Sequence, residues 1–147
     1  GLIGEELALS CSKIHGIDLS KSMLAIAHSK NVYSELIHDD IIQFLTISEL
    51  DYQFFVAADV FIYVGELSEV FELIKSRNKR RGHLVFSTEH SEIDGYHLEK
   101  SGRYSHSKCY IDSLCCKYKY TIGHFSKKNL RKENGLYLEA GIYFLSF

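Results

Sequence analysis

The feature that most constrains the fold of this chain is the alternation of short strand-like runs with amphipathic helical segments. Residues 54–58 (Phe-Phe-Val-Ala-Ala) form a continuous apolar run, which is typical of a strand buried on both faces. Further strands are predicted at residues 13–18, 35–38 and 83–88, and helical patterns lie between consecutive strands. Repeated strand–helix–strand connections predict an α/β fold, with a mostly parallel sheet and helices on both faces.

Two helix starts carry recognisable caps, and the end of the chain carries a hairpin signal. Ser20 and Ser68 are candidate N-caps of the second and fourth helices. Residues 89–105 show no periodicity and are predicted to be a loop, followed by a helix over 110–118. The fourth helix is predicted to bury one face, made of Leu67, Val70, Phe71 and Ile74.

The last segment predicts two antiparallel strands, at residues 120–125 and 136–147. The turn between them contains Asn134-Gly135, and Asn-Gly is a strong hairpin signal. The last strand of the sheet is therefore expected to run against the others.

Length and composition predict one globular domain over residues 1–147, with 46% hydrophobic and 24% charged residues. No apolar run reaches the roughly 18–20 residues of a membrane span. A net charge of −2 removes the electrostatic argument for nucleic acid or an anionic membrane as the main partner. Four cysteines without CxxC spacing predict buried or half-buried thiols in a reducing cytoplasm and no zinc site.

Acidic residues follow three of the predicted strands, where a parallel sheet binds its ligands. Asp18 stands 17 residues after Gly1, a spacing that suits an acid accepting hydrogen bonds from two ribose hydroxyls. An equally weighted interpretation is a helix N-terminal acid stabilised by the helix dipole. Asp40 and Asp59 follow the next strands, and each is also interpretable as a solvated loop acid.

Three segments together resemble the class I methyltransferases that use S-adenosylmethionine. They are residues 1–7 (Gly-Leu-Ile-Gly-Glu-Glu-Leu), 16–24 (Gly-Ile-Asp-Leu-Ser-Lys-Ser-Met-Leu) and 57–61 (Ala-Ala-Asp-Val-Phe). The resemblance covers essentially the whole chain. Residues 101–107 (Ser-Gly-Arg-Tyr-Ser-His-Ser) resemble a narrower subset, small-molecule methyltransferases that include TPR-linked bacterial members.

The resemblance implies a Rossmann-like fold and a cofactor site at the carboxyl ends of the strands. Gly1 would lie under the methionine moiety as the last glycine of a glycine-rich loop. The first strand and most of that loop are expected to be absent, since they would precede Gly1. Asp18 would bind the ribose diol and Leu19 would pack on the adenine, while Asp40 and the amide of Ile41 would face the adenine amino group.

The resemblance also implies the remaining cofactor and acceptor contacts. Ala57 would lie near the methionine amino group, and Val60 would line the pocket. Arg103 and Tyr104 would contact the acceptor, although Arg103 is equally interpretable as a surface ion-pair residue. A general base is needed only if the acceptor must lose a proton, and both candidate histidines also suit structural roles. The candidates for that base are Asp59, His90 and His106.

Two functions from different classes remain open at this stage. The first is S-adenosylmethionine-dependent methyl transfer to a small molecule. The second is a non-catalytic remnant or interaction module on the same fold, which the expected absence of the first strand favours. That absence also predicts weak cofactor binding and self-association through exposed sheet edges. A nicotinamide-dependent oxidoreductase fits less well, because residues 57–61 and the final hairpin resemble the methyltransferase arrangement.

Overall fold

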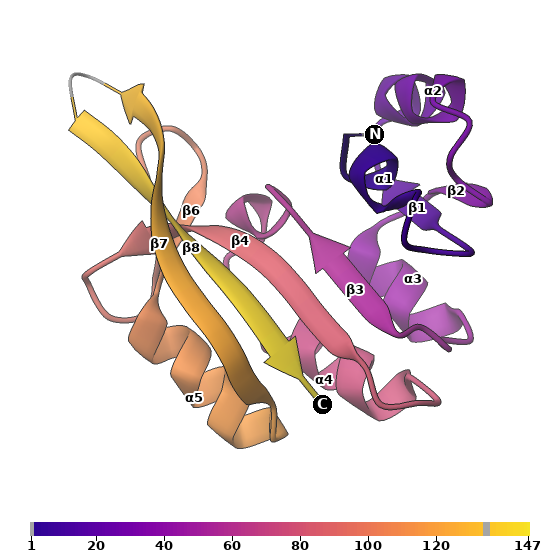
Figure 1. Cartoon of the computed structure of the whole chain (residues 1–147). Helices are drawn as coiled ribbons and strands as arrows, with labels where there is room; N and C mark the ends of the chain where they lie inside the picture. Colours follow the sequence, from indigo (N-terminus) through magenta and orange to yellow (C-terminus); the bar gives the residue numbers. More distant parts are fainter. Residues whose placement is uncertain (1, 134–135) are drawn as a thin grey trace. The chain divides into compact units, whose positions relative to one another are not determined.

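The computed structural model describes residues 2–133 and 136–147, and the chain divides into two compact units, Gly1–Ser48 and Glu49–Phe147 (Figure 1). Unit 1 contains α1 (Leu2–Leu7), β1 (His15–Asp18), α2 (Lys21–Ser29), β2 (Glu35–His38) and α3 (Ile41–Ile47). Unit 2 contains β3 (Phe54–Ala57), the 3-10 helix η1 (Phe61–Tyr63), α4 (Ser68–Arg77), β4 (His83–Ser91), β5 (Tyr96–Leu98), β6 (Tyr104–Ser107), α5 (Lys108–Tyr118), β7 (Thr121–Glu133) and β8 (Leu136–Ser146). The single domain predicted over residues 1–147 stays a prediction.

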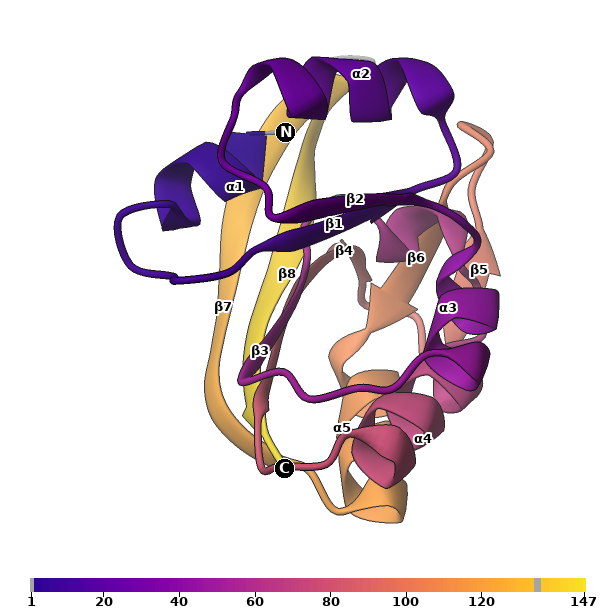
Figure 2. The ribbon, with the colours of Figure 1, turned by 90° about the vertical axis from the view of Figure 1, so that its right-hand side faces the viewer.

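Unit 1 is built on a parallel pair of strands. β1 and β2 pair in register, with Ile17 opposite Ile37, and α2 runs along them (Figure 2). The predicted cap of α2 is confirmed, because the hydroxyl of Ser20 accepts a hydrogen bond from the amide of Met23 at 3.3 Å. Capping satisfies an amide that the first turn of a helix leaves without a partner.

Unit 2 is built on a six-stranded mixed sheet with β4 at its centre. β3 pairs with β4 in parallel, from Phe54 opposite His83 to Ala57 opposite Phe86. Beyond the end of β3, the carboxyl end of β4 pairs in parallel with β6, and β5 pairs antiparallel with β6. On the other side β8 pairs antiparallel along β4, which confirms the predicted direction of the last strand.

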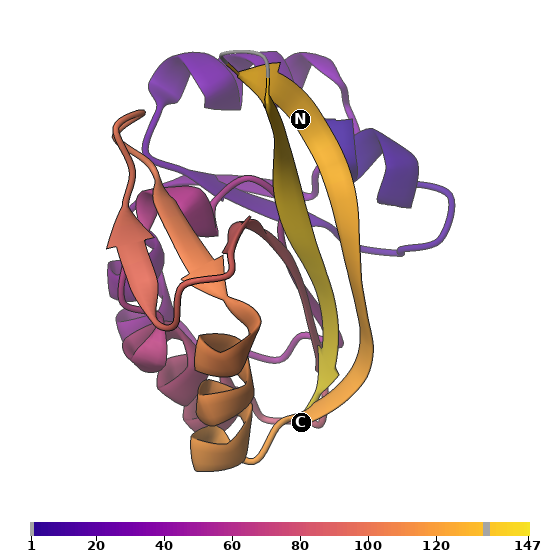
Figure 3. The same ribbon diagram turned by 90° about the vertical axis from the view of Figure 1, so that its left-hand side faces the viewer.

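The two last strands form a long curved antiparallel pair (Figure 3). They pair from Thr121 opposite Ser146 to Glu133 opposite Leu136, with register shifts after Ile122 and after Asn129. β7 is therefore longer than the predicted residues 120–125. The predicted turn residues Asn134 and Gly135 lie outside the described residues.

The core of unit 2 is aromatic and lies between α4 and one face of the sheet. Phe86 on β4 stacks on Tyr143 of β8, with ring centroids 4.9 Å apart and planes 10° apart. Phe71 of α4 meets the edge of the Phe86 ring at 5.9 Å, and Phe61 of η1 lies 5.1 Å from it. The face predicted for the fourth helix is confirmed as buried, and its members are Leu67, Val70, Phe71 and Ile74.

The prediction that Ser68 caps α4 is wrong. Ser68 is the first residue of α4, and the residue at the cap position, Leu67, makes no side-chain cap. The carboxylate of Glu66 accepts the hydrogen bond of the Ser68 amide instead, at 2.9 Å. An anion at this position also interacts favourably with the helix dipole.

The prediction of a loop over residues 89–105 is also wrong. β4 continues to Ser91, and the segment contains β5 and the start of β6. These two strands have 3 and 4 residues, too few to show a clear period of two in the sequence. α5 begins at Lys108 rather than at 110, because the hydroxyl of Ser107 caps it by accepting from the Tyr110 amide at 3.0 Å.

The four thiols are free, and only part of the burial prediction holds. Cys115 is buried and Cys11 is half-buried, whereas Cys109 and Cys116 are exposed. Within the described residues, every helix is too short or too polar to cross a membrane.

The aromatic core predicts which phenylalanine the stability of unit 2 depends on. Phe86 is 2% exposed, whereas Phe54 on the neighbouring strand is 49% exposed. Phe86→Ala is expected to lower the free energy of unfolding by about 3–5 kcal/mol, because it leaves a cavity among three aromatic rings. Phe54→Ala serves as the control and is expected to cost much less. Urea unfolding followed by circular dichroism measures both losses, and equal losses would contradict this account of the core.

Candidate functional site

In unit 1, two of the predicted acids lie at one edge of the β1–β2 pair. Asp18 is the last residue of β1 and pairs with His38, the last residue of β2, while Asp40 follows two residues later. Because the strands are parallel, their carboxyl ends share one edge, which is where such sheets bind ligands. The structure therefore brings Asp18 and Asp40 to the same edge of unit 1.

The local contacts of Asp18 leave acceptor capacity on its carboxylate. Oδ1 of Asp18 accepts the amide of Ser20 at 2.8 Å and so stabilises the start of α2. An ionised carboxylate accepts several hydrogen bonds, so this one contact does not exhaust it. Leu19 is 67% exposed, and its carbonyl is held by Nε2 of His38 at 2.9 Å. An apolar side chain on a fixed backbone thus lies next to an acid with free acceptor positions.

Asp40 has a clear local role as the N-cap of α3. Its Oδ1 accepts the amides of Ile42 at 2.8 Å and Gln43 at 3.2 Å. This capping explains an acid at the start of α3 without any ligand. The predicted contacts of Asp40 and of the Ile41 amide with an adenine stay predictions.

In unit 2, the carboxyl end of β3 carries an unusual backbone. Ala57, the last residue of β3, is buried, and Val60 is 36% exposed. Asp59 has a φ of 56°, in the left-handed region that Asp tolerates better than most residues. Its amide donates to the hydroxyl of Ser87 on β4 at 3.1 Å, while the residue itself is exposed. The chain thus turns sharply directly after β3.

His106, one of the candidate bases, is fully buried in unit 2. Its Nε2 lies 3.1 Å from the carbonyl oxygen of Val64 and 2.9 Å from that of Gly65. Carbonyl oxygens only accept, so Nε2 carries the proton. Burial lowers the pKa of His106 more than these two hydrogen bonds raise it, so the ring is held neutral. Its Nδ1 is buried with no hydrogen-bond partner among the described residues.

His90 and Arg103 each pair with an acid. Nε2 of His90 lies 3.3 Å from the carboxylate of Glu92. The guanidinium of Arg103 lies 3.8 Å from the carboxylate of Glu89, which is 3% exposed. Glu89 was not predicted, because the sequence gives no sign that this acid becomes buried beside a cation.

His90 also lines an open hollow together with Ser91, Glu92, Asp94, Ser107, Lys108, Cys109, Asp112, Phe125 and Lys127.

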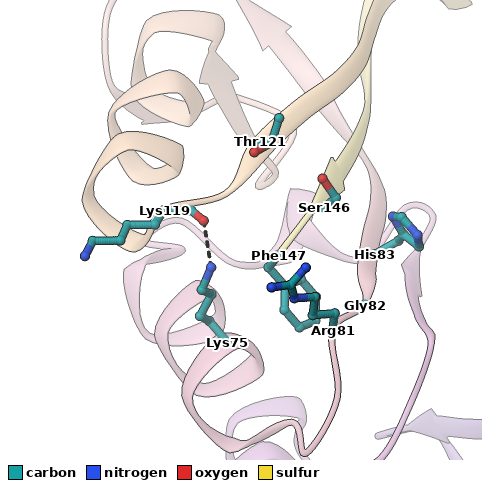
Figure 4. Close-up of a pocket in the computed structure, with 8 residues that line it drawn as sticks. All are labelled: Lys75, Arg81, Gly82, His83, Lys119, Thr121, Ser146 and Phe147. Atoms are coloured by element: carbon teal, nitrogen blue, oxygen red, sulfur yellow. Dashed lines mark hydrogen bonds between the residues drawn. The ribbon is translucent and has the colours of Figure 1, made fainter.

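A second hollow lies at the amino end of β4 and contains none of the predicted site residues (Figure 4). The ammonium of Lys75 donates to the carbonyl of Lys119 at 2.7 Å. Lys119 ends α5, so this contact stabilises the negative end of a helix dipole. The hollow is lined by Lys75, Arg81, Gly82, His83, Lys119, Thr121, Ser146 and Phe147.

The predicted site residues are thus divided between the two units. Asp18, Leu19, Asp40 and Ile41 belong to unit 1, while Ala57 and the residues after it belong to unit 2. Gly1 lies outside the described residues, so its predicted contact stays a prediction. Across residues 2–133 and 136–147, no group of three or more His, Cys, Asp or Glu is arranged to hold a metal ion.

Solved structures of S-adenosylmethionine-dependent methyltransferases resemble this chain over nearly its whole length. One from Methanosarcina mazei is 12% identical, with a TM-score of 0.70, over 97% of this chain and 85% of that one. Magnesium protoporphyrin IX methyltransferase from Synechocystis, with bound S-adenosylhomocysteine, is 18% identical, with a TM-score of 0.70, over 96% and 67%. The N-methyltransferase NodS from Bradyrhizobium japonicum, also with S-adenosylhomocysteine, is 15% identical, with a TM-score of 0.71, over 99% and 72%.

These likenesses show the fold, which is the mixed α/β fold of class I methyltransferases. No family model and no curated protein matches the sequence. The chain spans 51% of the similar TehB structure from Haemophilus influenzae. The absence of a first strand, which the resemblance implies, is not shown by these comparisons.

The capping role of Asp40 predicts a stability effect in unit 1. Asp40→Ala removes the acceptor for two amides of α3 and is expected to cost about 0.5–2 kcal/mol. Asp40→Asn keeps a side-chain oxygen at the cap and is expected to cost much less. Thermal unfolding of the two variants measures the difference. Equal losses would mean that the cap contributes nothing.

The buried neutral state of His106 predicts a pH dependence. Its pKa is lower in the folded state than in the unfolded state, so the unfolded state binds more protons as the pH falls below about 6.5. The stability that His106 contributes is therefore present above about pH 6.5 and is lost as the pH falls toward its folded pKa. Urea unfolding at about pH 7.5 and about pH 5.5 is expected to show a smaller loss for His106→Gln than for the wild type. His97→Gln is the control and is expected to keep the wild-type loss.

Proposed function

We propose that this chain is an S-adenosylmethionine-dependent methyltransferase that acts on a small molecule. The observation that carries the proposal is the carboxyl edge of the β1–β2 pair, where Asp18 retains acceptor positions beside the exposed Leu19. A diol with a neighbouring planar base, as in an adenosine, suits a carboxylate beside an apolar surface. The fold shared with methyltransferases that were solved with S-adenosylhomocysteine supports the same cofactor here.

The residues of unit 1 would hold the adenosine part of the cofactor. Asp18 would accept hydrogen bonds from the ribose hydroxyls, and Leu19 would pack on the adenine. Asp40 has one carboxylate oxygen engaged with α3 and would use the other toward the adenine amino group, beside the Ile41 amide. Gly1 would lie under the methionine part.

The residues of unit 2 would serve the methionine end and the acceptor. Ala57 would lie near the methionine amino group, with Val60 lining the pocket. When bound, the cofactor supplies an activated methyl group, so the protein mainly has to hold the acceptor at near-attack distance. Arg103, with Glu89 beneath it, and Tyr104 would bind that acceptor.

Of the three candidate bases, Asp59 has the most accessible side chain. His106 is sealed in the core with its Nε2 committed to two carbonyls, and His90 is paired with Glu92. Asp59 is exposed on a sharply turned backbone directly after β3. We therefore assign the general base to Asp59 for acceptors that must lose a proton.

One observation favours the alternative of a non-catalytic interaction module. Within the described part of unit 2, β3 pairs with β4 alone, and two apolar residues on this strand, Phe54 and Val56, are 49% and 39% exposed. An edge strand with exposed apolar side chains is a site for pairing with another chain. Under this alternative, the chain would self-associate through this edge. It would do so in the cytoplasm, with neither nucleic acid nor a membrane as its partner.

Calorimetry with S-adenosylhomocysteine separates the two functions. It is done on this chain, for which weak binding is expected. Asp18→Asn is expected to weaken affinity by at least about tenfold, which is about 1.4 kcal/mol, because charge-assisted hydrogen bonds to the ribose are lost. Glu35→Gln is the control, since Glu35 lies at the amino end of β2.

Two outcomes would count against the enzyme. The absence of binding heat would leave the interaction module as the better account. Unchanged affinity in Asp18→Asn would remove the ribose assignment even if the cofactor binds.

A further inference from the structure

Four residues between η1 and α4 are held by side chains that come from much later in the chain. This 64–67 loop consists of Val64, Gly65, Glu66 and Leu67. The side chains that contact it come from β6 and α5 and are Tyr104, His106 and Tyr110. Loops usually run over the surface, whereas this loop is bonded by the buried His106 and the half-buried Tyr110.

His106 satisfies the first half of the loop. Its Nε2–H is shared between the carbonyls of Val64 and Gly65, at 3.1 and 2.9 Å. The ring is fully buried, so water does not compete for these two acceptors. Without this donor, the carbonyls of Val64 and Gly65 would lose their hydrogen-bond partner beside a buried side chain. The free energy lost would exceed the net contribution of the hydrogen bond.

Tyr110 satisfies the second half of the loop. Its hydroxyl accepts the amide of Leu67 at 2.8 Å and lies 3.0 Å from the carboxylate of Glu66. Burial raises the pKa of Tyr110, so the hydroxyl stays protonated. It therefore donates a hydrogen bond to the carboxylate of Glu66. One hydroxyl group therefore bonds two consecutive residues of the loop.

Tyr104 closes the loop by packing on Gly65. A Cβ placed on Gly65 would lie 2.7 Å from Cε1 of Tyr104, so the ring occupies the space of a side chain. Tyr96 of β5 lies against the same group, 5.3 Å from the ring of Tyr110 and 6.2 Å from the ring of Tyr104. The loop is thus fixed by hydrogen bonds and by an aromatic cluster together.

We infer that Tyr104, His106 and Tyr110 form a latch, a set of positioning residues that holds the 64–67 loop for the methyl acceptor. The inference rests on the proposed function, because it assigns these residues to the acceptor side of that site. The chain from Ala57 to Leu67 is fixed at one end by the Asp59–Ser87 hydrogen bond and at the other by the latch. The candidate base Asp59 is itself at the first fixed end, and Val60 lies between the two.

The latch explains why His106 is buried, neutral and bonded to main-chain carbonyls. A general base must reach the proton that it removes, whereas Nε2 of His106 already donates and Nδ1 is sealed. His106 therefore acts through the loop and not on a substrate. Releasing the loop is expected to lower turnover more than cofactor affinity, because Asp18 and Leu19, the proposed contacts of the adenosine part, belong to unit 1.

Hydrogen exchange at the amide of Leu67 tests the latch. Tyr110→Phe removes the acceptor of this amide and keeps the ring, so exchange at Leu67 is expected to rise about fivefold or more. Tyr118→Phe is the matched control. Tyr118 is also on α5, and its hydroxyl also donates to a glutamate, Glu72 of α4, at 3.3 Å. Glu72 lies outside the 64–67 loop. The control is expected to leave exchange at Leu67 unchanged.

A pair of variants at His106 distinguishes positioning from mere packing. His106→Gln retains an N–H donor for the two carbonyls and is expected to keep most of the protection of the loop amides. His106→Leu fills the space without a donor and is expected to lose it. Amides in the β4–β8 ladder report whether each variant is folded.

The inference is overturned if Tyr110→Phe leaves exchange at Leu67 unchanged, if Tyr118→Phe raises it equally, or if His106→Leu protects the loop as well as His106→Gln does.

The affinity for S-adenosylhomocysteine is measured by titration of the same variants, and the affinity of Tyr110→Phe is expected to stay within about twofold of that of the wild type. A larger loss of affinity would overturn the assignment to the acceptor side. Exchange does not require activity, so failure of the latch and failure of the proposed function are separate results.

Discussion

Strand β4 is the element on which unit 2 depends, because it pairs with three other strands of the sheet. β3 and β6 follow one another along one side of it, and β8 covers the other side. A strand that is paired on both sides satisfies most of its backbone groups within the sheet, which allows its side chains to be buried. Phe86 lies on this strand, between the rings of Tyr143 and Phe71. The stacking of α4 on the sheet follows from that aromatic contact.

Polar contacts of two kinds lie at the two ends of β4. At its amino end, Lys75 donates a hydrogen bond to the carbonyl of Lys119, the residue directly after α5. At its carboxyl end lie the buried Glu89 beside Arg103 and, on β6, the buried His106. Buried polar groups are costly unless they are bonded, so their concentration at one end indicates a functional constraint there. The proposed acceptor side and its latch occupy this end.

Much of the fold followed from the sequence because the relevant signals are local. The apolar run at residues 54–58 predicted a strand, which is β3, but its predicted burial on both faces is wrong, because Phe54 and Val56 are 49% and 39% exposed. The i, i+3, i+4, i+7 spacing of Leu67, Val70, Phe71 and Ile74 predicted the buried face at α4. The cap at Ser20 was also readable, since capping involves residues three apart. β5 and β6 were missed because strands of 3 and 4 residues form only when a neighbouring strand offers an edge, which is β4 for β6 and β6 for β5. Ser68 was mistaken for a cap because α4 begins at Ser68 itself, so the cap position falls on Leu67.

By itself, the sequence determined the fold class, the acid at the end of β1 and the histidines worth considering as bases. The fold class and the acid depend on periodicity and on spacing along the chain, which a sequence contains directly, whereas the histidines became candidates through the resemblance to methyltransferases. Only the tertiary structure decided what His106 does, because its partners, Val64 and Gly65, lie about 40 residues earlier. The same holds for Glu89 beside Arg103 and for Tyr110 on the 64–67 loop. A side chain's protonation and role depend on the groups around it in space, and no local pattern specifies those groups.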